Sequence, residues 1–100
     1  MPEFPTLPPK ERLILELLVS SGPLYGLELV DRSDGGLKRG TVYVTLGRME
    51  DKGYVTSRLE EPPAAEGGLP RRLYQPTALG RRVFAVWSTA TGELIPEPAR

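Results

Sequence analysis

Residues 38–53, "KRGTVYVTLGRMEDKG", are the most informative segment of the chain. Val42, Leu46 and Met49 recur in it at the spacing of one helix face. Gly53 stands where a helix C-terminus favours glycine. The segment therefore predicts a helix that begins near residue 38 or 39 and ends at Gly53.

Two predicted strands follow this helix. They are "YVTSRLE" (54–60) and "RRLYQPT" (71–77), joined by the Pro/Gly-rich turn "EPPAAEGG" (61–68). On the return strand we expect Leu73 to face the core, with Arg72 and Tyr74 on the other face. A helix leading into a β-ribbon is the outline of a winged helix-turn-helix, which places a helix in the DNA major groove with the ribbon beside it.

The residues before residue 38 predict two more helices. The first runs from Pro8 or Pro9 to about Ser21, and it is apolar on two sides, so it needs two surfaces to pack against. The second runs from about residue 24 to 32, where Gly26 allows a close approach between helices. A turn, "SDGG" (33–36), follows, and Leu37 is expected to form a short strand that adds to the ribbon.

The C-terminal part predicts a fourth helix. Thr77 is a natural N-cap, the helix extends to about Thr91, and its apolar side is expected to hold Leu79, Val83, Val86 and Trp87. The predicted fold class is α+β: a winged helix-turn-helix with a three-helix core, a β-hairpin wing and one C-terminal helix. The predicted boundaries are an N-terminal arm (1–7), the winged helix-turn-helix (8–76), a C-terminal dimerisation helix (77–95) and a tail (96–100).

The composition excludes several classes of function. The 100 residues include no Cys and no His, which removes disulfides, the usual zinc ligands and catalysis by either side chain. The carboxylates do not converge at any spacing suited to a hydrolase. We therefore expect no catalytic residue, no metal site and no cofactor, and hence no enzyme. No apolar run is long enough to span a membrane and no signal peptide is apparent, so we expect a cytoplasmic protein.

The formal net charge is zero, but the charges are segregated along the chain. Residues 1–34 hold three basic and six acidic residues, and residues 59–70 hold three acidic residues alone. By contrast, residues 38–58 and residues 71–100 each hold five basic and two acidic residues. Positive charge thus gathers on the segments of the predicted recognition helix and ribbon base, as a DNA-binding face requires.

The candidate DNA-binding residues are basic, hydroxyl-bearing or aromatic, and they fall on the third helix and the ribbon. Arg can bind guanine or phosphate, and Thr can bind phosphate or contact a thymine methyl group. Gly40 is small enough for the helix N-terminus to approach a phosphate closely. The candidates are Lys38, Arg39, Thr41, Tyr43, Thr45, Arg48, Arg58, Arg71 and Arg72.

Each candidate also has a plainer explanation. The helix residues, which we expect to face outward, could form an ordinary solvated face, and Tyr43 could pack between helices. The ribbon arginines could pair across the strands with Glu60 and Glu61, which stabilises little at a surface. Arg81 and Arg82, which open the fourth helix, are interpreted as surface charge.

Three segments resemble the PadR family of bacterial transcriptional regulators. They are "GPLYGLELV" (22–30), "GTVYVTLGRMEDKGYV" (40–55) and "RRLYQPTALGRR" (71–82), and the similarity runs over about residues 10 to 82. The Gly-Thr-x-Tyr start at residues 40–43 is its specific part. The resemblance implies a winged-helix homodimer that binds an operator, and usually repression that a small molecule relieves. Long-form members carry a larger C-terminal helical domain, whereas this chain is expected to have one helix of about 15 residues and no separate ligand-binding domain.

The resemblance also implies a dimer built from the C-terminal helix and the first helix of the partner. Apolar residues predicted to lie at that interface are Leu15, Val19, Phe84, Trp87 and Leu94. Trp87 is a further candidate for binding a small aromatic effector by stacking, although a lone Trp is commonly an interface or core anchor. The predicted function is a sequence-specific DNA-binding transcriptional regulator, a repressor acting as a homodimer on double-stranded operator DNA. The alternative is a winged-helix adaptor that binds proteins and not DNA.

Overall fold

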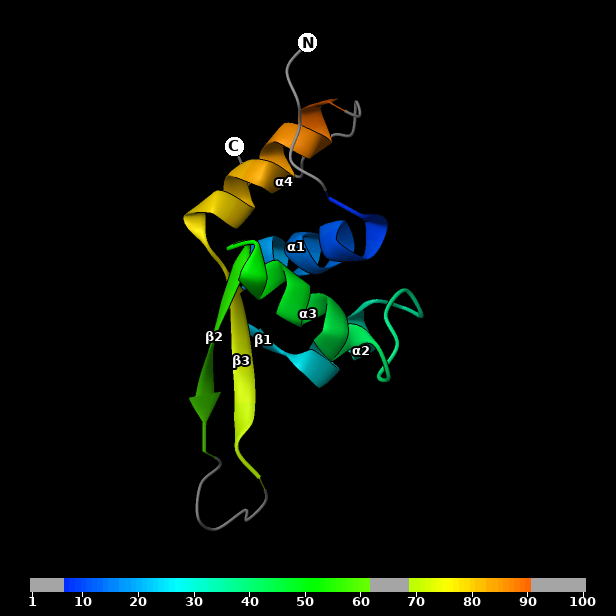
Figure 1. Ribbon diagram of the computed structural model, residues 1–100. Helices are drawn as coiled ribbons and strands as arrows, with labels where there is room; N and C mark the ends of the chain where they lie inside the picture. Colours follow the sequence, from blue (N-terminus) through cyan, green and yellow to red (C-terminus); the bar gives the residue numbers. More distant parts are fainter. Residues whose placement is uncertain (1–6, 62–68, 91–100) are drawn as a thin grey trace.

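The computed structural model describes residues 7–61 and 69–90, which form four helices and three strands (Figure 1). In chain order the elements are α1 (Pro9–Ser21), β1 (Leu24–Tyr25), α2 (Gly26–Arg32), α3 (Val42–Asp51), β2 (Val55–Glu60), β3 (Arg71–Pro76) and α4 (Ala78–Ala90). The α+β winged helix-turn-helix predicted from the sequence is confirmed. The predicted tail and the segment 62–68 of the predicted turn lie outside the described residues.

Helix α1 is the centre of the core. Ile14, Leu15 and Leu18 have no exposed surface, because α4 lies on one side of α1 while α3 and the sheet lie on the other (Figure 1). The two apolar sides of this helix are thus both covered within one chain. Leu7, which the sequence placed in an arm, is also buried in this core.

An ion pair joins the first turn of α1 to the C-terminal end of α3. The Lys52 Nζ donates to Glu11 Oε1 and Oε2 at 2.9 and 3.1 Å, and the Glu11 carboxylate is almost fully buried. The pairing lets an acidic residue lie at the edge of the core, since a buried carboxylate without a partner is costly.

The sheet is antiparallel with strand order β1-β3-β2. The strand that adds to the ribbon is β1, in which Leu24 pairs with Tyr74 and Tyr25 pairs with Leu73. The prediction that Leu37 adds to the ribbon is therefore wrong. Leu37 instead lies buried in a turn, where its N–H donates to Ser33 Oγ at 2.9 Å. The side-chain hydroxyl satisfies the backbone that a strand would have paired.

The ribbon formed by β2 and β3 is the wing. Its strands confirm the prediction, but its core-facing residue is Tyr74, which is buried, and not Leu73. The register pairs Ser57 with Tyr74 and Val55 with Pro76. Because cross-strand partners share a face, Tyr74 extends the buried face that Val55 begins.

Helix α4 begins as predicted. Thr77 Oγ1 accepts the Gly80 N–H at 2.9 Å, the hydrogen bond of an N-cap. Gly80 lies so close to the Tyr54 carbonyl that a Cβ at this position would collide with the oxygen. This contact sets α4 directly over the start of β2.

The apolar side of α4 differs from the prediction. Val83 and Phe84 face the core, whereas Leu79 and Val86 are each 41% exposed. The predicted face was displaced by about one residue, because helical spacing alone does not say on which side the rest of the chain will pack. Among the described residues, no helix is long and apolar enough to cross a membrane.

Candidate nucleic-acid interface

The segment before α3 is a tight turn and not the first turn of the helix. The N–H groups of Thr41 and Val42 both donate to the Lys38 carbonyl, at 3.1 and 2.9 Å, and α3 begins only at Val42. The predicted helix start near residue 38 was therefore three to four residues early. Lys38, Arg39 and Gly40 lie exposed on this turn, at the N-terminal end of α3.

The two faces of α3 are clearly divided. The buried residues are Val42, Thr45, Leu46 and Met49. Thr45 was predicted to face outward, but its side chain faces the core and its hydroxyl donates to the Thr41 carbonyl at 3.2 Å. That internal hydrogen bond lets a polar residue occupy the inner face, so Thr45 is removed from the candidate interface.

The outward face of α3 consists of Thr41, Val44, Gly47 and Arg48, spaced three and four residues apart. Val44, which is 56% exposed, was not among the residues predicted to face outward. The signal was available in the helical period, because Val44 lies three residues after Thr41 and four before Arg48. An apolar side chain favours the core, whereas the helical spacing of Val44 from Thr41 and Arg48 favours the outward face.

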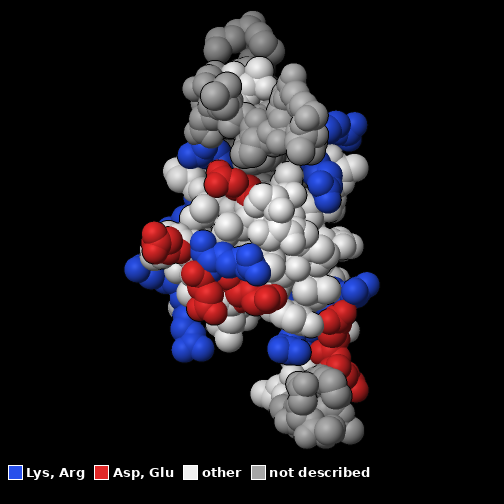
Figure 2. Space-filling view, turned by 180° about the vertical axis from the view of Figure 1, so that it is seen from behind, with Lys and Arg blue, Asp and Glu red and all other residues white. Residues whose placement is uncertain are grey.

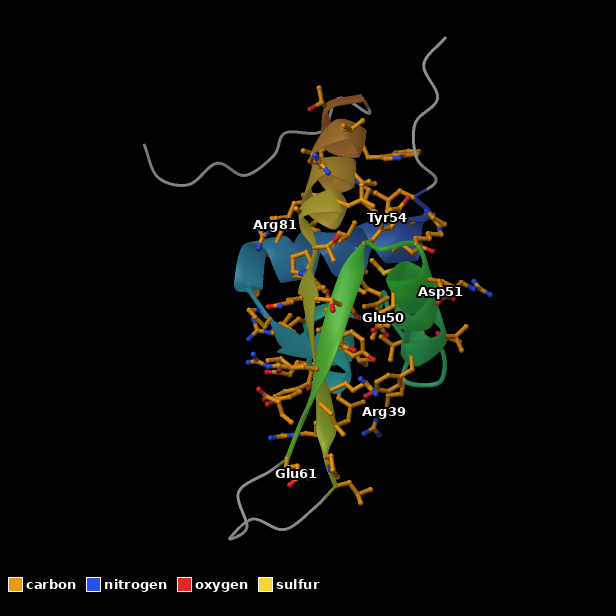
Figure 3. The ribbon with its side chains drawn as sticks, turned by 60° about the vertical axis from the view of Figure 1, so that its left-hand side comes forward. Arg39, Glu50, Asp51, Tyr54, Glu61 and Arg81 are labelled. Carbon is orange, nitrogen blue, oxygen red and sulfur yellow. The ribbon has the colours of Figure 1, made fainter. Side chains whose placement is uncertain are left out.

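The charged residues near α3 differ between its two ends: Lys38 and Arg39 precede its first residue, whereas Arg48 lies in its last turn with Glu50 and Asp51. Arg39 lies at the N-terminal end, toward the wing, while Glu50 and Asp51 lie at the other end (Figure 3). A helix N-terminus carries partial positive charge, so cations there do not stabilise the helix but do reinforce its attraction for an anion. Within residues 7–61 and 69–90, Lys38, Arg39 and Arg48 have no ion pair or side-chain hydrogen bond.

Tyr43 packs against α2 and is also exposed. Its ring packs on Gly26 at the start of α2, where an added Cβ would lie 2.5 Å from the ring carbon Cε1. The side chain is nevertheless 50% exposed. Gly26 thus permits the close approach that the sequence predicted, although a side chain rather than a helix backbone takes the space.

A groove of about 450 Å³ separates the start of α2 from the wing. Tyr43 lies on its α3 side, Leu27 on its α2 side and Leu59 on its wing side, all three substantially exposed. Its lining residues are Tyr25, Gly26, Leu27, Glu28, Tyr43, Leu59, Pro70, Arg71, Arg72 and Tyr74.

The wing arginines, unlike the cations of α3, have partners. Arg58 donates through Nε to Glu60 Oε2 at 3.1 Å, and its terminal nitrogen lies 3.1 Å from the same oxygen. Arg71 lies over the Tyr25 ring, 4.4 Å from its centroid. Arg72 donates to Ser57 Oγ at 3.3 Å. Arg58 thus pairs with Glu60 of its own strand, β2, and not with a residue on the opposite strand.

Glu60 links the wing to β1. The Tyr25 hydroxyl donates to Glu60 Oε1 at 2.6 Å, joining residues 35 positions apart. This hydrogen bond, with the nearby Arg58, lowers the pKa of Glu60 below its ordinary value. The same bond raises the pKa of Tyr25, because the carboxylate stabilises the protonated phenol. At neutral pH the link is therefore a charge-assisted hydrogen bond.

Acidic and basic side chains are interspersed on the face seen in Figure 2, including along the wing. Arg81 and Arg82 are exposed on α4, and Arg81 lies at the start of that helix, away from Arg39 (Figure 3). Among the described residues, Lys38, Arg39 and Arg48 on and before α3 have no acidic partner, and neither do Arg81 and Arg82 on α4.

Two of the residues predicted to form a dimer interface are buried within the chain. Leu15 has no exposed surface and Phe84 only 6%, because α1 and α4 pack on each other. These two predictions are wrong for that reason. Val19 and Trp87 are partly buried against the same core, and Leu94 lies outside the described residues.

Together, the fold and the outward α3 face define a winged-helix protein of the kind that regulates transcription. The model of the transcriptional regulator PadR-like family matches residues 14–86, and the chain belongs to that family. The resemblance stated from the sequence is confirmed. No curated protein shows significant sequence similarity to the chain.

Solved structures agree with this assignment. Bacillus subtilis PadR in complex with operator DNA is 22% identical with a TM-score of 0.74, and the match covers 95% of this chain and 54% of that one. A PadR family transcription regulator from Clostridium difficile R20291 is 26% identical with a TM-score of 0.70, over 81% of this chain and 84% of that one. The chain thus spans about half the length of the Bacillus protein and most of the Clostridium one.

Proposed function

We propose that this protein is a sequence-specific DNA-binding transcriptional regulator that reads the major groove with α3. The observation that carries the proposal is the outward side of α3 with the turn before it, where exposed Lys38, Arg39 and Arg48 have no partner among the described residues. Family membership and a fold shared with an operator-bound regulator support it. In this arrangement the wing lies over the adjacent phosphate backbone.

The contacts divide by chemistry. Arg48 and Thr41 lie on the outward helix face and would reach base edges or the flanking phosphates. Lys38 and Arg39 would bind phosphates at the helix N-terminus. The wing arginines Arg58, Arg71 and Arg72 would bind phosphate after exchanging their present partners.

The test is a selection from random duplexes, followed by fluorescence anisotropy with the selected sequence at several salt concentrations. If a dimer makes about 6 to 8 phosphate contacts, log K should fall against log salt with a slope of roughly −5 to −7. Recovery of no preferred sequence at low salt would contradict the proposal.

The proposed active form is a homodimer that represses by occupying its operator. The exposed Leu79 and Val86 of α4, beside the partly buried Trp87, are the apolar surface that supports it. Two-fold pairing would match the symmetry of operator half-sites, with recognition helices about 34–36 Å apart.

Two exposed valines provide a matched test of assembly. Val86→Glu should give a monomer in sedimentation velocity at micromolar concentration, because a charge in the interface is costly to bury. Val44→Glu, the same change on α3, should leave the dimer intact and abolish operator binding. A wild-type chain that sediments as a monomer while binding its operator tightly would contradict the dimer.

A small aromatic effector is proposed to act at Trp87, at the dimer interface. The partly buried indole on α4 supports this, since it offers a flat surface beside the proposed contact. Planar aromatic compounds should quench Trp87 fluorescence and change operator affinity together. Quenching with unchanged operator affinity would limit Trp87 to a structural role.

The groove between α2 and the wing favours a second candidate, an adaptor that binds another protein. Leu27, Tyr43 and Leu59 give it an apolar lining, and its volume of about 450 Å³ suits a few side chains of a peptide. The two functions differ in their sensitive residues. DNA binding requires Arg48 and tolerates Leu27→Asp, whereas an adaptor requires Leu27 and tolerates Arg48→Ala.

A further inference from the structure

The middle of the outward α3 face is apolar. Val44 points away from the core residues Val42, Leu46 and Met49, and 56% of it is exposed. Exposure of a branched aliphatic side chain at this place has no explanation in the packing of the chain.

The surroundings of Val44 leave room for a close partner. A Cβ added at Gly47, one turn along the same face, would meet nothing within 4 Å, and the same holds at Gly40 before the helix. Val44 therefore projects from a part of the surface where the neighbouring positions Gly40 and Gly47 carry no side chain. Polar groups flank it on this face, with Thr41 one turn before it and Arg48 one turn after it.

We infer that Val44 contacts the C5-methyl group of a thymine in the operator and selects for that base. Among the base edges of the major groove, this methyl group is the apolar feature, while the other edges present hydrogen-bond donors and acceptors. A valine flanked by Thr41 and Arg48 thus combines one apolar contact with polar contacts to adjacent positions. The inference rests on the proposed function and adds to it which base is read by which residue.

Uracil substitution isolates this contact. Replacing one thymine of the selected operator by deoxyuridine removes the methyl group and preserves base pairing and all hydrogen-bonding groups. For wild-type protein, deoxyuridine at one position in each half-site should lower the affinity for the operator about three- to fivefold. This is the loss expected when one methyl-sized group is left unburied. Val44→Ala should weaken binding by a similar factor and should remove the uracil effect at that position.

Leu27→Ala is the control, because it truncates an exposed apolar side chain on the neighbouring α2. This variant should keep the full uracil effect. Circular dichroism should show that both variants fold, since each changes an exposed helix residue to alanine.

The outcomes separate the two proposals. A selected operator without a fixed thymine in the α3 half-site overturns the inference, as does a uracil effect that persists in Val44→Ala. In both cases DNA binding itself stands. Failure of wild-type protein to select any duplex overturns the proposed function, and the Val44 contact with it.

Discussion

Helix α3 with the turn before it and the wing carry similar positive charge but hold it differently. Lys38, Arg39 and Arg48 are exposed and have no partner among the described residues. Every wing arginine has one: Arg58 pairs with Glu60, Arg71 covers the Tyr25 ring and Arg72 bonds Ser57. Counting charges along the sequence would rate the two regions alike.

The difference has an energetic consequence for DNA binding. A cation without a partner gives up only water when it meets a phosphate or a base. A wing arginine must also give up a partner within the protein, so its net contribution is smaller. We therefore expect α3 to supply the sequence preference and most of the affinity, and the wing to supply a smaller, sequence-independent part.

The largest effect is expected from Arg48→Ala. Loss of its contact should cost about 1–3 kcal/mol of operator affinity and relax the preference at one base position. Thermal stability should hardly change, because Arg48 has no partner in the described chain. Arg81→Ala, at the start of α4 and away from Arg39, is the matched control and should bind as wild type. Anisotropy with the operator and with single-base variants measures both effects.

Arg72→Ala should have a smaller and different effect. It should weaken binding to all duplexes by a similar factor and reduce the salt slope by about one, as expected for loss of one phosphate contact. If Arg72→Ala changed the preference among operator variants while Arg48→Ala did not, the assignment of reading to α3 and of backbone contact to the wing would be reversed.

Glu60→Gln is expected to strengthen binding. It removes the negative charge that holds Arg58 and keeps an acceptor for the Tyr25 hydroxyl. Affinity at low salt should rise about twofold for any sequence, since exposed ion pairs are weak. Glu61→Gln, which removes an equal charge farther along the wing, is the comparison variant. An equal gain from both would indicate a general charge effect rather than release of Arg58.

The smallest effect concerns the link between Tyr25 and Glu60. Because the pKa of Glu60 is lowered in the folded protein, its stabilisation is complete above the ordinary value of 4.5 and is lost as pH falls through the folded pKa. Tyr25→Phe removes the main cause, so the pKa of Glu60 should rise toward 4.5. NMR titration of the Glu60 carboxyl carbon measures this shift, and an unchanged pKa would mean that Arg58 rather than Tyr25 sets it.

Local signals predicted most of the fold. Helix α1 from Pro9, the wing strands and the Thr77 cap were all present in the sequence as turn residues, caps and periodicity. The two-residue strand Leu24–Tyr25 was not, because it exists only through pairing with β3. A segment this short carries no period of its own.

The candidate site was less predictable, because tertiary contacts decide which side of each helix is free. Thr45 faces the core, because its hydroxyl can donate to the Thr41 carbonyl in the preceding turn. Val44, the neighbouring position on the helix, faces outward. Leu15 and Phe84 are buried because α4 folds back on α1. The hydrogen bond between Tyr25 and Glu60 spans 35 positions, and no local pattern indicates it.

The most direct test of the central claim is a map of backbone amide NMR shifts as operator DNA is added to the full chain. The largest changes are expected over residues 39–48, smaller changes on the wing strands near Arg58 and Arg72, and little change around Arg81. Changes concentrated at Leu27 and along the groove, or on α4 alone, with residues 39–48 unmoved, would contradict the claim that α3 reads the DNA.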